Sequence, residues 1–206
     1  MRLSKHLVIF ARNPRLGTGK RRLARDIGPV AALRFQRVIL SLILRRIGND
    51  RRWTTWLAVT PDYSNPWPQR YRRLPQGRGD LGKRMASVVQ KLPPGPVVII
   101  GSDIPEIATS DIAHAFRDLG HKDAVFGPAV DGGFWLVGLR RRPHFVDPFQ
   151  SVRWSSEHAL TDTLANLPHK SVSLLRLLSD VDDGAALSVI PAGSPFHGHC
   201  RTQTSH

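Results

Sequence analysis

Short apolar runs alternate with longer amphipathic segments along the chain. The apolar runs are rich in β-branched residues and are bounded by glycine, proline or polar residues, which is typical of strands buried on both faces of a sheet. The segments between them place apolar residues near the helical period, as Val30, Leu33 and Val38 do. Strands are therefore predicted at His6–Ala11, Trp53–Thr60, Val97–Ile100, Ala124–Pro128, Phe134–Leu139 and Ser171–Leu175.

Helix boundaries follow from capping and breaking residues. Helices are predicted from Gly28-Pro29 to Gly48, from the N-cap Asp80 through Leu92, from Thr109 or Ser110 to Leu119, from Ser155 or Ser156 through Asn166, and, as a short last one, from Asp182-Asp183. The connections Arg12–Asp26 and Pro61–Arg73 are predicted to be irregular, and Leu74–Gly79 to be a tight turn.

Strands that alternate with helices predict an α/β fold with a mostly parallel sheet. The strands Ala124–Pro128 and Phe134–Leu139 are too close in sequence for a helical crossover, so an added antiparallel piece or a bent strand pair is expected there. No repeat and no second domain is evident. We expect one domain over residues 1–190, followed by a polar tail over 191–206.

Composition narrows the class of protein. The 206 residues are enough for one well-buried core, and the single cysteine, Cys200, excludes a disulfide framework and favours a reducing compartment. No apolar run reaches the roughly 20 residues that a membrane span needs. A cytoplasmic protein is expected.

The net charge is +14, from 30 Lys and Arg against 16 Asp and Glu, and 24 of the 30 are Arg. Such a surface attracts nucleic acid, anionic lipid or phosphorylated small molecules. The Arg pairs are scattered over the whole chain, and no zinc-finger spacing or aromatic RNA-binding strand accompanies them. Nucleic acid is therefore disfavoured as a partner, and a general preference for Arg over Lys would explain the same composition.

Asp103 stands just past the predicted strand Val97–Ile100. Gly101 and Pro105 mark the end of this strand, and open α/β sheets bind ligands at the carboxyl ends of their strands. Asp103 is therefore a candidate ligand for a divalent metal on a nucleotide diphosphate. From this stretch alone, a carboxylate that only caps the following turn is an equal alternative.

Two further loops carry charge that suits phosphate chemistry. The loop after the first strand is rich in glycine and cations, and Lys20 and Arg22 could neutralise phosphates, although its sequence fits neither a Walker A motif nor a dinucleotide fingerprint. In the second loop, Gln76 could contact a base or sugar edge, and Asp80 suits both a ligand contact and a helix cap.

Asp131 precedes two glycines and follows the strand Ala124–Pro128. A plain Asp-Gly turn is common, but two carboxylates at one sheet edge, Asp103 and Asp131, repel each other unless a cation lies near them. This favours a functional role for both. The nine histidines form no zinc pattern, and no nucleophile motif is present.

Taken together, these stretches resemble a bacterial glycosyltransferase-A-like family, often found beside radical-SAM and selenodomain proteins, within the nucleotide-diphospho-sugar transferase superfamily. The similar segments span nearly the whole chain: Val8–Pro14 with Lys20–Leu23, Gln76–Met85, Gly101–Pro105, Phe126–Gly138, Trp154-Ser155 and Asp180–Asp182. Three of them depart from the family pattern, with Arg21, Ile104 and Phe134-Trp135 where the family has Thr, Cys and two Tyr.

The resemblance implies a Rossmann-like three-layer α/β/α sandwich. It also implies that Ala11, Lys20 and Arg22 bind nucleotide and phosphate, and that Asp103 binds Mg²⁺ or Mn²⁺. We therefore expect a metal-dependent transfer of a sugar from a nucleotide-diphospho-sugar to a small-molecule acceptor, with Asp131 as catalytic base or second metal ligand, and Gln76 and Asp80 on the nucleotide. The alternatives are a nucleotidyltransferase that releases pyrophosphate and a non-enzymatic nucleic-acid-binding protein. The base, sugar, acceptor, stereochemistry and oligomeric state stay open.

Overall fold

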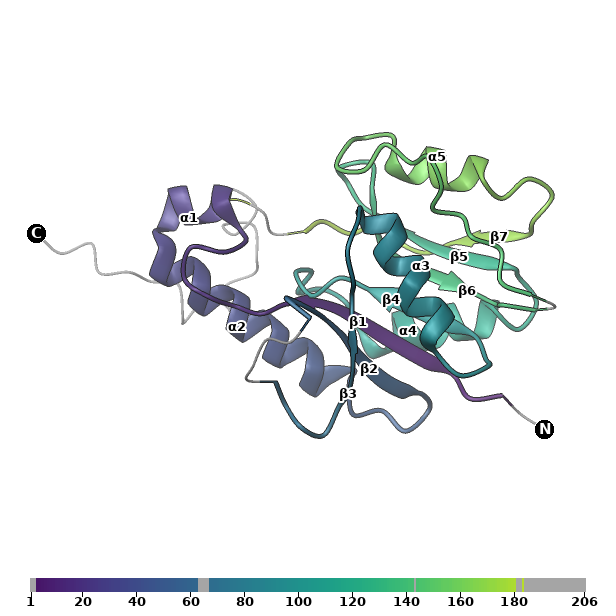
Figure 1. Cartoon of the computed structure of the whole chain (residues 1–206), viewed down its shortest axis with the longest axis horizontal. Coiled ribbons are helices and arrows are strands. Elements are labelled where there is room, and N and C mark those ends of the chain that lie inside the picture. The colour runs from purple at the N-terminus through teal and green to yellow at the C-terminus, as the bar shows by residue number, and fades with distance from the viewer. Residues whose placement is uncertain (1–2, 63–66, 143, 181–182, 184–206) are drawn as a thin grey trace, which may run out of the picture.

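The computed structural model describes residues 3–62, 67–142, 144–180 and 183, and these form a seven-stranded sheet with five helices (Figure 1). The strands are β1 (His6–Arg12), β2 (Thr54–Thr60), β3 (Arg72–Pro75), β4 (Val97–Ile100), β5 (Ala124–Pro128), β6 (Phe134–Leu139) and β7 (Val172–Leu174). The helices are α1 (Arg21–Ile27), α2 (Pro29–Arg46), α3 (Leu81–Lys91), α4 (Thr109–Asp118) and α5 (Ala159–Ala165).

The sheet is mostly parallel, and its strand order is β3-β2-β1-β4-β6-β5-β7. Strand β1 lies parallel to both β2 and β4, and β7 lies parallel to β5. Strand β6 is antiparallel to both of its neighbours, β4 and β5. Of the two arrangements expected for these strands, an added antiparallel piece or a bent strand pair, the structure has the antiparallel piece. It leaves β4 and β5 pointing the same way, so their carboxyl ends lie at one edge of the sheet.

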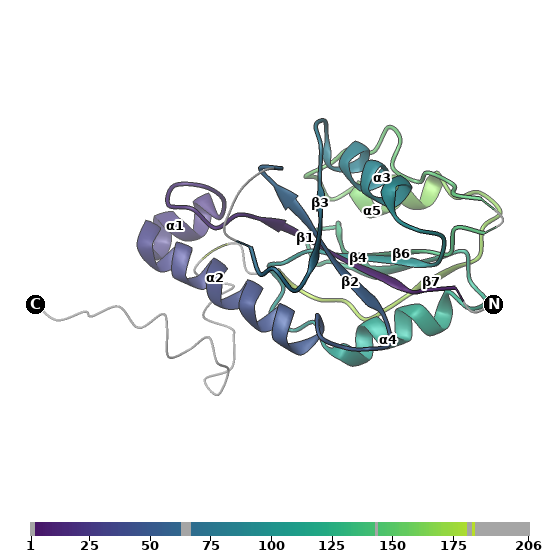
Figure 2. The same cartoon turned by 60° about the horizontal axis from the view of Figure 1, so that its bottom comes forward.

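Helices cover both faces of the sheet, because successive strand residues face opposite sides. In β1, Leu7 and Ile9 join one apolar core, in which Phe35 of α2 and Phe116 of α4 are also buried. Val8 joins the other core, on the side of α3 and α5. Figure 2 shows α2 and α4 on one side of the sheet and α3 and α5 on the other. The predicted three-layer α/β/α sandwich is confirmed.

Three local predictions were wrong. Strand β3 lies where an irregular connection and a turn were expected. Among the described residues it pairs only with β2, so it is an edge strand. Its exposed residues Arg72 and Arg73 are polar, and it therefore lacks the apolar run by which the other strands were predicted. Helix α1 lies in the expected loop and buries a single residue, Leu23. Helix α5 starts at Ala159, with His158 as its N-cap residue, later than predicted. Ser156 instead belongs to a preceding turn, in which its Oγ donates to the Arg153 carbonyl oxygen (2.6 Å) and accepts from the His158 N–H (3.3 Å).

The predicted last helix at Asp182-Asp183 and the predicted tail over 191–206, with Cys200, lie outside the described residues. Among the described residues, no helix is both long and apolar enough to cross a membrane.

Candidate functional site

The loop after β1 leads the chain away from the sheet and back to its carboxyl edge. Ala11, near the end of β1, is buried, and Gly17 and Gly19 both have positive φ values, of 75° and 74°. Lys20 follows as the N-terminal flanking residue of α1 and itself takes a left-handed conformation, with φ 44° and ψ 45°. Glycine adopts such angles readily, so the two glycines allow the tight reversal that returns Lys20 to the strand ends.

Asp103 follows β4, the neighbour of β1, in a segment whose backbone is held in place by a side chain of α2. The guanidinium of Arg46 on α2 donates hydrogen bonds to the carbonyl oxygens of Pro105 (2.8 Å) and Ile107 (3.2 Å). A Cβ atom added at Gly101 would lie 2.9 Å from Oδ1 of Asp103, so the carboxylate folds back over the strand end and a larger residue at position 101 would displace it.

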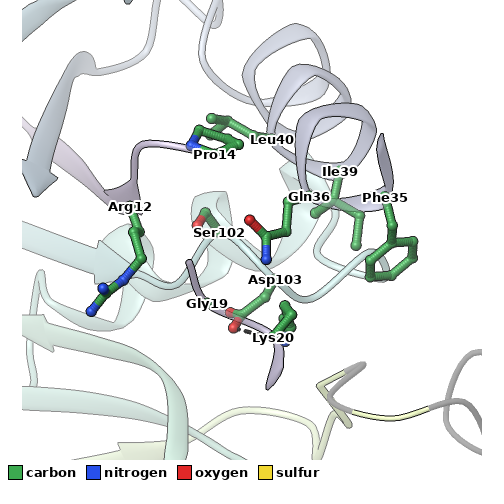
Figure 3. Close-up of a pocket in the computed structure, with 10 residues that line it drawn as sticks. All are labelled: Arg12, Pro14, Gly19, Lys20, Phe35, Gln36, Ile39, Leu40, Ser102 and Asp103. Carbon is green, nitrogen blue, oxygen red and sulfur yellow. Dashed lines mark ion pairs between the residues drawn. The ribbon is translucent and has the colours of Figure 1, made fainter. Parts of the chain in front are cut away.

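The structure brings Lys20 and Asp103 together. The Lys20 Nζ lies 3.1 Å from Asp103 Oδ2, and the lysine side chain is 8% exposed whereas the aspartate side chain is 46% exposed. Both line a cavity of about 200 Å³ between the loop and α2, the lysine cavity below. Figure 3 shows the two side chains facing each other, with Gln36 reaching towards them from α2 and Arg12 on the far side.

The lysine cavity has an apolar wall and a charged floor. Phe35, Ile39 and Leu40 of α2 line one side, and Ser102 lies beside Asp103. A half-exposed carboxylate next to a nearly buried ammonium group offers both an anion-binding and a cation-binding atom within one small space.

A divalent metal at Asp103 would depend on ligands from outside the chain. Among the described residues, no group of three or more His, Cys, Asp or Glu side chains is arranged to hold a metal ion. Mg²⁺ is commonly held by one or two carboxylates together with phosphate oxygens and water. The half-exposed Asp103 carboxylate fits such a shared site, and it does not fit a metal held by the protein alone.

A second polar group lies at the carboxyl ends of β1 and β2. The buried Gln76 donates from Nε2 to the carbonyl oxygens of Ala58 (2.8 Å) and, more weakly, Ala11 (3.4 Å). Its Oε1 accepts from Arg84 Nη1 at 2.9 Å. Gln76 therefore fixes the position of Arg84 and of the end of β1, and its buried amide is engaged within the protein.

Arg84 is partly buried and feels the positive charge of Arg12. Burial, and then the positive charge of Arg12, lowers the pKa of Arg84, while the carboxylates Asp80 and Asp62 act in the opposite direction. Arg12 also lines the lysine cavity, so it lies between the two polar groups. An anion near these two positive charges would be favoured.

Asp80 occupies the N-cap of α3, where its side chain accepts a hydrogen bond from the Lys83 N–H at 2.8 Å. The capping role expected from the sequence is confirmed. Its Oδ1 serves the cap, and its proposed contact with nucleotide stays a prediction.

Asp131 and Arg22 are not among the residues that line the lysine cavity. Asp131 is exposed, in the β5–β6 turn, and its Oδ1 accepts a hydrogen bond from the Gly133 N–H at 2.9 Å. It shares with Asp103 the sheet edge at the ends of β4 and β5, but β6 lies between these strands. Arg22 is exposed in the first turn of α1.

Gly132 follows Asp131 in a closely packed turn. A Cβ atom there would lie 2.2 Å from the carbonyl oxygen of Glu157, so the space beside this glycine is filled by the backbone of the same chain. The partly buried Trp154 packs against the rings of Phe134 and Phe149.

Sequence reasoning missed Arg12, Gln36 and Arg84. Arg84 stands four residues after the cap Asp80, which places it on the same face of α3 and was a usable signal. Gln36 gave none, because a polar residue on a helix is ordinarily solvent-exposed.

Comparison with known proteins assigns the family. Residues 43–156, more than half of the chain, match the family described as "Uncharacterized protein conserved in bacteria (DUF2064)". The chain belongs to this family. No curated protein matches it. The narrower radical-SAM-associated type implied by the resemblance stays a prediction.

Solved structures share the fold. A proposed nucleotide-diphospho-sugar transferase from Desulfovibrio desulfuricans G20 is 25% identical with a TM-score of 0.85, over 97% of this chain and 95% of that one. A 2-C-methyl-D-erythritol 4-phosphate cytidylyltransferase from Thermus thermophilus is 13% identical with a TM-score of 0.56, over 98% and 100%. The protein Rv0371c from Mycobacterium tuberculosis H37Rv, in complex with manganese, is 14% identical with a TM-score of 0.53, over 91% and 97%. The fold is thus that of nucleotide-diphospho-sugar transferases and cytidylyltransferases, as predicted.

Proposed function

We propose that the protein is a transferase that binds a nucleotide-diphospho-sugar at the lysine cavity and transfers the sugar to a small-molecule acceptor. The observation that carries the proposal is the Lys20–Asp103 pair, 3.1 Å apart at the carboxyl edge of the sheet. Parallel α/β sheets bind ligands at this edge. The overall similarity to a proposed nucleotide-diphospho-sugar transferase, over nearly the whole of both chains, supports the substrate class.

The cations of the site would hold the diphosphate. Lys20 would donate hydrogen bonds to phosphate oxygens inside the lysine cavity. The positive charges of Arg12 and Arg84 would attract further phosphate oxygens. Arg22 and Asp80 are proposed to contact the nucleotide as it enters, since both are exposed near the ends of the binding loops. Ala11 would present its backbone at the end of β1, where the amide of Gln76 contacts its carbonyl oxygen.

Asp103 is the residue that would hold Mg²⁺ or Mn²⁺, jointly with the phosphates. A bound divalent ion neutralises the charge of a leaving diphosphate. The manganese complex of Rv0371c supports this choice of ion only by shared fold. Asp131, in the β5–β6 turn outside the lysine cavity, is proposed to act as the base that takes the proton from the acceptor hydroxyl or as a second metal ligand.

A nucleotidyltransferase is the second candidate, because cytidylyltransferases share the fold. In that reaction a phosphorylated acceptor attacks the α-phosphate of a nucleoside triphosphate and pyrophosphate leaves. The same Lys20 and Asp103 would serve both reactions, so the products decide between them.

The test is a thermal-shift panel of nucleoside triphosphates, nucleoside diphosphates and nucleotide-sugars, each with and without Mn²⁺. A specific ligand raises the melting temperature because it binds only the folded protein. We expect at least one nucleotide to do so, more strongly with Mn²⁺. Release of a nucleoside diphosphate from a nucleotide-sugar would then identify sugar transfer, and release of pyrophosphate would identify nucleotidyl transfer.

Asp103→Asn tests the metal role. The variant is expected to lose the additional stabilisation that Mn²⁺ gives to the nucleotide complex, while nucleotide alone still binds. Glu106→Gln is the matched control, since Glu106 is an exposed carboxylate three residues away that does not line the cavity. An undiminished Mn²⁺ effect in Asp103→Asn would exclude this carboxylate as the metal ligand. If no nucleotide shifts the melting temperature of the unaltered protein, the proposed function is wrong.

A further inference from the structure

A second hollow, of about 280 Å³, adjoins the lysine cavity between the glycine loop, α1 and α2. Three arginines line it, Arg15 from the loop and Arg21 and Arg25 from α1. Ala24, Ala32 and Leu33 give it an apolar side, and no acidic side chain is among its lining residues. We name it the arginine hollow.

The three guanidinium groups differ from several other arginines of the structure. Arg52, Arg153 and Arg176 each pair with a carboxylate. Within the part of the chain that the structure describes, the side chains of Arg15, Arg21 and Arg25 make no ion pair or hydrogen bond.

Three like charges around one concave space repel each other, and an anion placed among them removes that repulsion. Guanidinium groups also bind phosphate and carboxylate oxygens through paired N–H donors. The arginine hollow therefore has the chemistry of an anion site, with an apolar side suited to a short carbon body.

Only a thin partition separates the arginine hollow from the lysine cavity. Gly19 and Gln36 line both spaces. A Cβ atom at Gly19 would lie 3.3 Å from Gln36 Nε2, so the partition consists of a glycine backbone and one amide side chain. Groups bound on its two sides would be close neighbours.

We propose that the arginine hollow binds the anionic group, a phosphate or a carboxylate, of the acceptor, next to the donor in the lysine cavity. This inference rests on the proposed transferase function and adds the class of acceptor, a small anion with a short apolar body. The acceptor hydroxyl would approach the donor past Gln36.

The test compares two double variants that remove equal charge. Arg21→Gln/Arg25→Gln removes two residues of the arginine hollow, whereas Arg34→Gln/Arg45→Gln removes two exposed arginines of α2 that line neither space. Glycerol 1-phosphate and, separately, propionate are titrated calorimetrically at low ionic strength into each variant and into the unaltered protein. The stronger of the two probes identifies phosphate or carboxylate.

We expect the stronger probe to bind at least 10-fold more weakly to Arg21→Gln/Arg25→Gln than to the control double variant. Arg15→Gln, which alters only the loop, should weaken it in the same direction. Equal affinity in the two double variants would overturn the proposal.

Nucleotide binding is measured in parallel, and it separates this inference from the proposed function. Nucleotide affinity is expected to match between the two double variants, and a loss parallel to that of the small anion would overturn a separate acceptor site. If nucleotides fail to bind the unaltered protein while the anion result holds, the proposed function fails and the anion site stands.

Discussion

Lys20→Met separates a binding role of the lysine from a structural one. Methionine keeps most of the apolar stem and removes the ammonium group, so the packing against the cavity wall is largely retained. Lys91→Met is the matched control, because Lys91 is exposed at the last position of α3 and lies away from the carboxyl edge of the sheet.

The expected effect on stability is small. The lysine side chain is 8% exposed, but its partner Asp103 is 46% exposed, so water screens the ion pair from one side. Pairs that reach solvent contribute about 0–1 kcal/mol, and the free energy of unfolding should fall by no more than about 1 kcal/mol. Asp103 can be rehydrated when the lysine is lost, which avoids the larger cost of an isolated buried charge.

The expected effect on nucleotide binding is much larger. Hydrogen bonds to charged groups are worth about 1.5–3 kcal/mol, which corresponds to roughly 10- to 150-fold in affinity. Calorimetric titration with the best nucleotide from the thermal-shift panel measures it, and Lys20→Arg should restore part of the loss because it restores the charge. Equal nucleotide affinities for Lys20→Met and Lys91→Met would refute the phosphate-binding role.

Two further predictions concern stability. Burial lowers the pKa of His6 below its ordinary 6.5, so as the pH falls below 6.5 the unfolded chain takes up a proton before the folded protein does. The melting temperature of the protein should therefore fall relative to that of His6→Phe as the pH is lowered from 7 towards 5, and parallel curves would contradict this. Gly132→Ala places a Cβ atom 2.2 Å from the Glu157 carbonyl oxygen at a φ of 82°, and chemical denaturation should show a loss of more than about 2 kcal/mol, whereas a near-neutral result would mean that the turn can shift.

The sandwich could be predicted because its central strands carry their signal locally. Val97–Ile100 is apolar throughout and completely buried, so its sequence alone predicts a strand that is buried on both faces. Strand β3 could not be predicted, since an edge strand with exposed Arg72 and Arg73 is defined by its pairing with β2 and not by its own sequence. Helix α1 is similar, because its seven residues bury only Leu23 and depend on packing against α2.

The site was predictable to the extent that it follows strand ends. Lys20 and Asp103 each come after a predicted parallel strand, and adjacent parallel strands bring such residues to one edge. The contacts of Gln76 were not predictable, because they join residues 18 and 65 positions apart. Sequence reasoning found a polar residue in a loop, and the structure shows a buried amide that positions Arg84.

Part of the strong positive charge of the chain lies at the candidate site. Outside the site, Arg46 and Arg141 donate to backbone carbonyl groups and hold loops in place, so they serve the fold rather than a nucleic-acid surface. Residues 12–37 hold eight Lys or Arg and one acidic residue, Asp26, which is half of the net charge of +14. Five of these eight cations line the lysine cavity or the arginine hollow: Arg12, Lys20, Arg15, Arg21 and Arg25. Since a small anion can reach such concave spaces and a duplex cannot, the charge favours phosphorylated small molecules over nucleic acid.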